Sequence, residues 1–324
     1  MLINWKCARR LGSVAFLGIA LASATVAVRA DDVKDASGRA VAAGNTGRIV
    51  SIGGDVTEIL YALGMDKRIV GIDTTSTYPP RAAAEKASVG YMRQLSAEGV
   101  LGLNPTLILT VEGAGPKETI AVLEAAHVPL VVARDTFTGE GIIDKVSVIA
   151  QATGTAARGR CIIERVRTDL GALGRLEKDI GKPKRVMFVL SFVSGRAMVS
   201  GRNTAADGII NLAGAVNAVT DYEGYKTIND EAVIAAKPDV ILVIERGGPA
   251  TLTADMVFAR PSFAVTPAGF NRSFVSMDGL YLLGFGPRTA RAARDLAGAL
   301  YPHLKSEALE SVGNDGRTEA CRSL

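Results

Sequence analysis

Two stretches of this chain repeat one another at a constant offset of 133 positions. Residues 95–109, LSAEGVLGLNPTLIL, align without a gap with residues 228–242, INDEAVIAAKPDVIL. A capping residue, a glutamate, a helical segment, a proline and an apolar strand recur in the same order. Chance readily supplies an apolar pattern, but it supplies the matched glutamate and proline less readily. The repeat therefore predicts two related lobes, each a small α/β sandwich.

Short apolar strands alternate with helical segments along both halves of the chain. This alternation predicts an α/β fold with mainly parallel sheets covered by helices. Asp55 follows the first strand and is a candidate N-cap for the first helix. The expected strands lie at 48–52, 68–72, 106–110, 129–133 and 185–190. The expected helices include 97–103, 116–126, 139–153, 204–212 and 290–301.

The two halves are separated by residues 155–180, which keep apolar side chains at helical spacing over many turns. An α-helix of this length would span roughly 39 Å, which suits a rigid connector between lobes. Three glycines lie inside the segment, and each costs about 1 kcal/mol relative to alanine. A break within the helix is therefore the alternative.

The N-terminus has the pattern of an export signal. Lys6, Arg9 and Arg10 precede an apolar run at 11–28, and small residues near Ala30 suit cleavage there. An uncleaved membrane anchor is the alternative, because about 18 apolar residues approach the lower limit for a span. The first 30 residues carry four basic side chains and no acid, which equals the whole formal charge of +4. The neutral remainder gives no electrostatic reason to expect nucleic acid as a partner.

Side chains for catalysis or zinc binding are scarce. The only histidines, His127 and His303, lie at a helix end and near the C-terminus, and we expect neither to act as a base or ligand. Neither a Gly-x-Ser-x-Gly elbow nor a phosphate-binding loop occurs. Cys161 and Cys321 are far apart in sequence, and whether they pair is open. We therefore expect a binding protein with its ligand between the lobes, and an exported enzyme using that cleft is the alternative.

Residues 91–99, YMRQLSAEG, resemble the haem-site motif of the periplasmic haem-binding proteins of bacterial ABC importers. Residues 104–108, 237–242 and 278–288 are similar to further signatures of this family, and the resemblance covers about 48–302. The proline–strand elements also occur in the wider group that binds cobalamin and ferric siderophores, so such a ligand is an alternative.

The resemblance implies the helical-backbone, class III substrate-binding fold: two α/β lobes joined by one long α-helix. It also implies a monomer that acts in the periplasm, is not an enzyme, and delivers haem b to an ABC permease dimer with its ATPase. The expected organisation is a signal peptide at 1–30, a flexible leader at 31–47, an N-terminal lobe at 48–154, the connecting helix at 155–180, a C-terminal lobe at 181–304 and a polar tail at 305–324.

By the same resemblance, Tyr91 is the axial ligand of the haem iron. A phenolate oxygen is a hard donor that suits ferric iron. A free tyrosine has a pKa near 10, so a neighbouring cation would favour the ionised form. Arg93 is placed to do so if the segment is extended, because alternate side chains then share a face. A tyrosine packed at a strand end is the alternative. The other expected haem contacts are the cations Arg196, Arg202, Lys226 and Arg246 and the rings of Tyr78 and Tyr225.

No histidine precedes His303 in the second half, so a single haem on Tyr91 is expected, without a histidine as second ligand. Met198 is a weaker candidate for a soft axial ligand.

The resemblance also implies that the matched glutamates of the repeat, Glu98 and Glu231, dock on arginines of the permease. Alternatively, each glutamate stabilises its own helix, because an acid near a helix N-terminus interacts favourably with the helix dipole.

Overall fold

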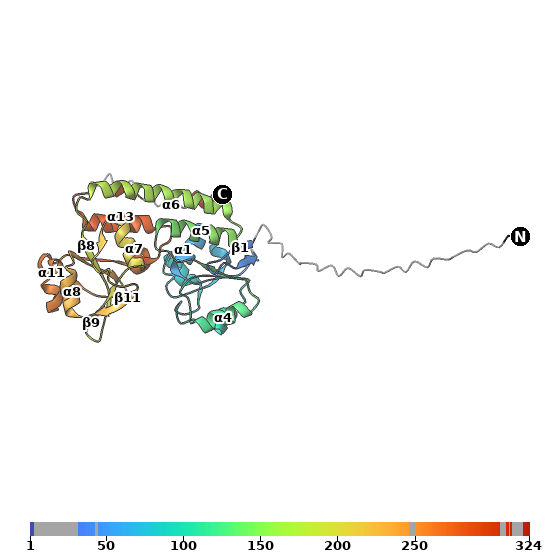
Figure 1. Ribbon diagram of the computed structural model, residues 1–324, viewed down its shortest axis with the longest axis horizontal. Helices are drawn as coiled ribbons and strands as arrows, with labels where there is room; N and C mark the ends of the chain where they lie inside the picture. The colour runs from blue at the N-terminus through green and yellow to red at the C-terminus, as the bar shows by residue number, and fades with distance from the viewer. Residues whose placement is uncertain (3–31, 43–44, 246–250, 305–308, 311, 313–319) are drawn as a thin grey trace.

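The computed structural model describes residues 1–2, 32–42, 45–245, 251–304, 309–310, 312 and 320–324. The expected signal peptide at 1–30 lies outside the described residues except for residues 1–2. The chain forms two α/β lobes side by side, with one long helix lying across both (Figure 1). This arrangement confirms the predicted fold class.

The first lobe is built on a five-stranded parallel sheet in the order β5-β4-β3-β6-β7. Every strand and helix expected from the sequence in this lobe is present. The strands are β3 (Ile49–Ser51), β4 (Ile69–Ile72), β5 (Ala87–Ser88), β6 (Leu107–Val111) and β7 (Leu130–Ala133). The helices are α1 (Gly54–Ala62), the 3-10 turn η1 (Asp66–Arg68), α2 (Pro80–Glu85), α3 (Ala97–Leu101), α4 (Lys117–Ala125) and α5 (Gly139–Ala152).

The segment expected to be a flexible leader contains a strand pair instead. β1 (Asp32–Lys34) and β2 (Ala40–Ala42) pair antiparallel, and β1 packs against α5. Val33 is buried in the core, and Asp35 pairs with Arg39 at 2.8 Å. Buried Val33 and an ion pair between Arg39 and Glu124 of α4 at 2.7 Å hold this hairpin on the lobe, and such contacts are too few to recognise from the sequence.

The second lobe carries a mixed sheet in the order β11-β9-β8-β12-β13, with β10 beside β8. Strands β8, β10, β12 and β13 are parallel, whereas β9 and β11 form an antiparallel ribbon at one edge. The strands are β8 (Arg185–Val193), β9 (Arg196–Ser200), β10 (Val216–Asn217), β11 (Tyr225–Ile228), β12 (Val240–Glu245) and β13 (Phe274–Asp278). The helices are α7 (Ala205–Leu212), α8 (Asp230–Ala236), α9 (Ala254–Phe258), α10 (Pro261–Ala264), α11 (Pro267–Asn271), α12 (Gly279–Leu283) and α13 (Thr289–Leu300).

The connector is a single α-helix, α6 (Ala156–Leu176), followed by the 3-10 turn η2 (Glu177–Asp179). Its three glycines do not break it. At Gly159 an added Cβ would lie 2.4 Å from the Cβ of Ala150, so glycine here allows α6 to approach α5 closely. The buried face of α6 rests on α5 and α13. The connector is therefore braced by one helix of each lobe.

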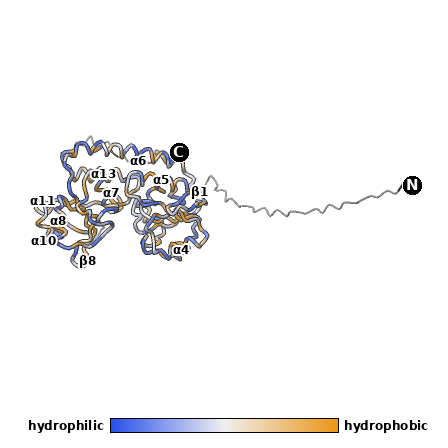
Figure 2. Tube along the Cα trace, in the orientation of Figure 1, coloured by the Kyte–Doolittle hydropathy of each residue, from blue (hydrophilic) through white to orange (hydrophobic). Residues whose placement is uncertain are grey.

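One hydrophobic core continues through both lobes beneath α6, and two smaller clusters fill the outer faces of the sheets. Figure 2 shows apolar residues along the strands inside each lobe, whereas hydrophilic and apolar residues alternate along α6.

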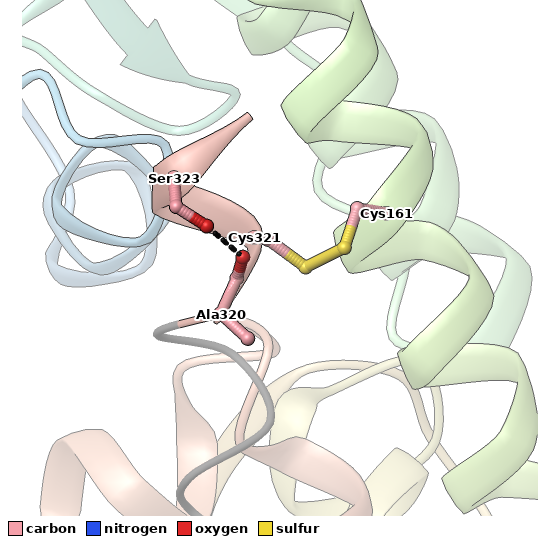
Figure 3. Close-up of a disulfide and its surroundings, with 4 residues drawn as sticks. All are labelled: Cys161, Ala320, Cys321 and Ser323. Atoms are coloured by element: carbon pink, nitrogen blue, oxygen red, sulfur yellow. Dashed lines mark hydrogen bonds between the residues drawn. A yellow bond between two sulfur atoms is a disulfide. The ribbon is translucent and has the colours of Figure 1, made fainter.

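The structure also resolves the cysteine pairing that the sequence left open. Cys321, in the C-terminal 3-10 turn η4 (Ala320–Ser323), forms a disulfide with Cys161 of α6 (Figure 3).

Candidate functional site

Tyr91 and Arg93 lie in a turn that follows β5. The Nη1 atom of Arg93 donates a hydrogen bond to the Tyr91 hydroxyl at 3.0 Å, and the Tyr91 side chain is 39% exposed. The predicted contact is present, but the extended geometry expected for it is wrong. The amide of Gln94 donates to the Tyr91 carbonyl at 2.8 Å, which closes a turn. Gly90, at a φ of 89°, starts that turn in a conformation that favours glycine.

The Arg93 guanidinium of this pair influences the phenol of Tyr225 in the second lobe. Burial raises the pKa of the Tyr225 phenol, while the Thr204 hydroxyl, a backbone group at Ala206 and the Arg93 guanidinium act in the opposite direction. Arg93 belongs to the first lobe, so this electrostatic effect acts between the lobes. The Tyr225 ring also packs edge-on against Phe188 of β8, with ring centroids 6.3 Å apart.

The other candidate residues on the β9–β11 ribbon lie on its two opposite faces. Directly paired residues of two strands share a face. Tyr225 pairs with Ser200 and Thr227 pairs with Met198, so Met198 lies on the Tyr225 face. Lys226 pairs with Val199, which packs into the opposite core cluster, and its ammonium lies 5.0 Å above the Tyr222 ring. The structure therefore places Lys226 on the face away from Tyr225.

Arg196 and Arg202 have second-lobe residues as their neighbours. Arg196 borders a groove of about 610 Å³ that is lined entirely by second-lobe residues, including Asn229 and Ala232 beside α8. Arg202 lies 4.0 Å from the carboxylate of Glu223, and both side chains are more than half exposed. Arg246 lies outside the described residues.

Tyr78 occupies the boundary between the lobes. Its side chain is 39% exposed, and the guanidinium of Arg288 lies 3.5 Å from its ring centroid. Arg288 also lies 5.1 Å from the ring of Tyr281 and donates from Nε to Oε2 of Glu58 at 3.0 Å. Because Arg288 covers one face of the Tyr78 ring, only the other face can stack on a ligand.

A buried charge cluster lies at the start of α1, and the sequence did not indicate it. Asp55 is not the N-cap; that position is Gly53, and no side chain caps the helix. The Asp55 carboxylate pairs with Lys145 of α5, whose ammonium also contacts Asp135 at 2.8 Å. Burial by itself would lower the pKa of Lys145, but the two carboxylates raise it. Lysines seldom point inward without partners, and here one partner, Asp55, lies 90 positions away in sequence.

The two glutamates of the repeat occupy equivalent places. Each is the second residue of its helix, α3 for Glu98 and α8 for Glu231, and each is exposed. The side chain of Ser96 caps α3 by accepting from the Gly99 amide, and that of Asn229 caps α8 by accepting from the Ala232 amide. Capping therefore needs neither glutamate, and both carboxylates are presented to solvent.

Among the described residues, no group of three or more His, Cys, Asp or Glu side chains could hold a metal ion. Within the same part of the chain, no helix combines the length and the apolar character needed to cross a membrane.

Comparisons with known proteins add family information to this geometry. The family described as periplasmic binding protein matches residues 49–280. The solved apo structure of RhuT, a periplasmic haem-binding protein from Roseiflexus sp. RS-1, is 42% identical in sequence. It superimposes with a TM-score of 0.75 over 80% of this chain and 99% of that one.

Curated relatives are more distant, and one of them is named for a different ligand. An uncharacterised ABC transporter substrate-binding lipoprotein of Bacillus subtilis, YvrC, is 25% identical over 80% of this chain and 82% of its own length. A vitamin B12-binding protein of Pectobacterium carotovorum is 24% identical over 78% of this chain and 88% of its own.

Proposed function

Because the chain belongs to the periplasmic binding protein family, we propose that it captures haem between its lobes and delivers it to an ABC permease. Proteins of this family and its structural neighbours bind substrates for transport and are not enzymes. The family implies a ligand and an ABC permease as partners. The observation that carries the choice of haem is the exposed Tyr91 hydroxyl held by the Arg93 guanidinium at 3.0 Å.

The Tyr91–Arg93 pair has the chemistry that ferric porphyrin requires. A tyrosine oxygen is a known axial ligand of haem iron. A guanidinium that donates to this oxygen favours its negative charge. Because the Tyr91 side chain is 39% exposed, its oxygen is accessible to a ligand that enters between the lobes.

The remaining haem contacts are proposed in an order that follows the geometry. Tyr225 and the free face of Tyr78 would contact the porphyrin ring, and Met198 lies on the same ribbon face as Tyr225. Arg196 and Arg202 are exposed cations that could pair with propionates, although Arg202 has Glu223 nearby. Lys226 ranks below them because it lies on the opposite face. Arg246 stays a prediction from the sequence.

Glu98 and Glu231 are proposed as the permease contacts. They stand at equivalent positions in two related lobes, so they suit a partner that presents two equivalent arginines.

Export to the periplasm with cleavage near Ala30 completes the proposal. A disulfide between Cys161 and Cys321 is consistent with such an oxidising compartment. Mass spectrometry of the exported protein tests the cleavage site.

Titration of the purified protein with hemin tests the ligand and the residue together. We expect a strong Soret band that saturates, and the stoichiometry at saturation gives the number of haems bound. Tyr91→Phe keeps the ring but removes the ligand oxygen, so the band should shift or disappear. Arg93→Gln should weaken hemin binding about 10–100-fold, as loss of a group that orients a metal ligand typically does.

A parallel titration with cyanocobalamin distinguishes the second candidate, which the vitamin B12-binding relative supports. Saturable cobalamin binding without a Soret change on adding hemin would overturn the haem proposal. Hemin binding that is unaffected by Tyr91→Phe would retain haem but remove Tyr91 as its ligand. Lys178→Gln is a matched control, because this exposed lysine lies in η2 after the connector and its loss should leave the spectrum unchanged.

A further inference from the structure

Tyr78 lies in a loop of the first lobe, between β4 and α2, that is held by buried hydrogen bonds. The carboxylate of Asp73, at the start of the loop, accepts from the Ser76 hydroxyl at 2.8 Å, and these two residues are only 2% and 1% exposed. The Thr74 amide donates to the Gly90 carbonyl at 2.9 Å. The loop that carries Tyr78 therefore lies beside the turn that carries the candidate iron ligand.

The guanidinium of Arg288 contacts one face of the Tyr78 ring. It lies 3.5 Å from the ring centroid, and a cation in this position is attracted by the negative face of the ring. The same guanidinium lies 5.1 Å from the ring centroid of Tyr281. Because Arg288 follows α12 in the second lobe, a residue of one lobe holds an aromatic ring of the other.

Arg288 is itself fixed by a partner other than Tyr78. Its Nε atom and its backbone amide each donate to the Glu58 carboxylate at 3.0 Å, and the side chains of Arg288 and Glu58 are 20% and 7% exposed. Gly286 leaves room for this carboxylate, because an added Cβ would lie 3.3 Å from it. The cation is therefore held in place by Glu58 and can define where the Tyr78 ring lies.

From these contacts we infer that Arg288 is a positioning residue that holds the Tyr78 ring as a platform for the face of a porphyrin, with or without iron. The inference rests on the proposed function, and it adds that the ring of the ligand is recognised separately from its metal. An offset stack on a tyrosine ring requires a flat aromatic partner. A porphyrin is flat, whereas the corrin of cobalamin carries side chains on both faces, so the platform favours porphyrin.

Iron-free protoporphyrin IX tests this inference, because it offers the flat ring without a metal for Tyr91. We expect its fluorescence to change and saturate on titration with the protein. Tyr78→Leu replaces a side chain that is 39% exposed, so the fold should survive. This variant should bind protoporphyrin and hemin more weakly by a similar factor, about three- to tenfold. Tyr91→Phe, in contrast, should weaken hemin binding far more than protoporphyrin binding.

If Arg288 acts through Tyr78, their substitutions should not add. Arg288→Met should weaken protoporphyrin binding about threefold in the parent protein and no further in the Tyr78→Leu variant. A second readout needs no ligand: 3-fluorotyrosine at position 78 reports the surroundings of the ring by fluorine-19 magnetic resonance. Its resonance should move toward that of the fully exposed amino acid when Arg288 is replaced.

Arg81→Met is the matched control for the Arg288 variant. The Arg81 guanidinium also lies over a tyrosine, 5.3 Å from the ring centroid of Tyr61. The Tyr61 side chain is only 4% exposed, so this ring cannot stack on a ligand. Arg81→Met should therefore leave protoporphyrin binding unchanged.

The outcomes separate the platform from the proposed function. A protein that binds hemin but not protoporphyrin would overturn the platform and leave the proposed function standing. Equal weakening by Arg288→Met with and without the Tyr78 ring, or an unmoved fluorine resonance, would also overturn the positioning role. Protoporphyrin binding that depends on Tyr78, beside hemin binding that does not depend on Tyr91, would support the platform and remove only the iron ligand. Failure to bind either porphyrin would remove both proposals.

Discussion

The tyrosines of this protein differ in the surroundings of their hydroxyl groups. Burial raises the pKa of Tyr222 to about 12, and burial also raises the pKa values of Tyr225 and Tyr281. These three phenols therefore stay protonated near neutral pH and suit ring stacking or hydrogen bonding. Tyr91 differs because its oxygen accepts a hydrogen bond from the Arg93 guanidinium. At the scale of single residues, this contrast makes Tyr91 the candidate for binding iron.

Lys145 provides a stability prediction at the same scale. Its side chain is fully buried and pairs with Asp55 and Asp135. Lys145→Met should lower the free energy of unfolding by about 3–5 kcal/mol, because it leaves buried carboxylate charge without a cation. Urea unfolding followed by circular dichroism measures the change. Asp55→Asn added to Lys145→Met should restore part of the loss, and an undiminished loss in the double variant would contradict this explanation.

The secondary structure elements show which features the sequence could predict. Helices α3 and α8 follow local rules, so their caps, Ser96 and Asn229, could be recognised from the repeat. Other features depend on distant residues. The Cys161–Cys321 bond joins parts of the chain that meet only after folding. The register of β11 decides which way Lys226 points, and a one-residue shift would reverse it.

The cap of α8 provides a prediction at the scale of elements. The Asn229 side chain accepts from the Ala232 amide at 3.0 Å at the start of the helix that presents Glu231. Asn229→Ala should lower the free energy of unfolding by about 1 kcal/mol, because that amide loses its partner. Chemical denaturation measures the change, and Asn229→Asp, which retains an acceptor, should behave almost as the parent. Equal losses in both variants would show that capping is not the cause.

At the scale of the whole molecule, the lobes are joined along one side and face each other on another. Phe137 of the first lobe packs edge-on against buried Phe285 of the second, with centroids 5.3 Å apart. Gly54 lies against Leu280 so closely that an added Cβ would be 2.5 Å from its side chain. Together with α6 across the back, these contacts restrict the lobes to small relative movements. Under the proposed function, ligand specificity would come from side chains such as Tyr91 more than from large closure.

The ion pair between Glu58 and Arg288 should stabilise the contact between the two lobes. Both the Nε atom and the backbone amide of Arg288 donate to the Glu58 carboxylate at 3.0 Å, and the two side chains are only 7% and 20% exposed. A double-mutant cycle with Glu58→Gln and Arg288→Met should give a coupling free energy of about 1–3 kcal/mol, because the charges are shielded from water and bonded in fixed geometry. Urea unfolding of the four proteins measures it. Additive single effects would contradict a direct contribution and would leave apolar packing and α6 as the features that join the lobes.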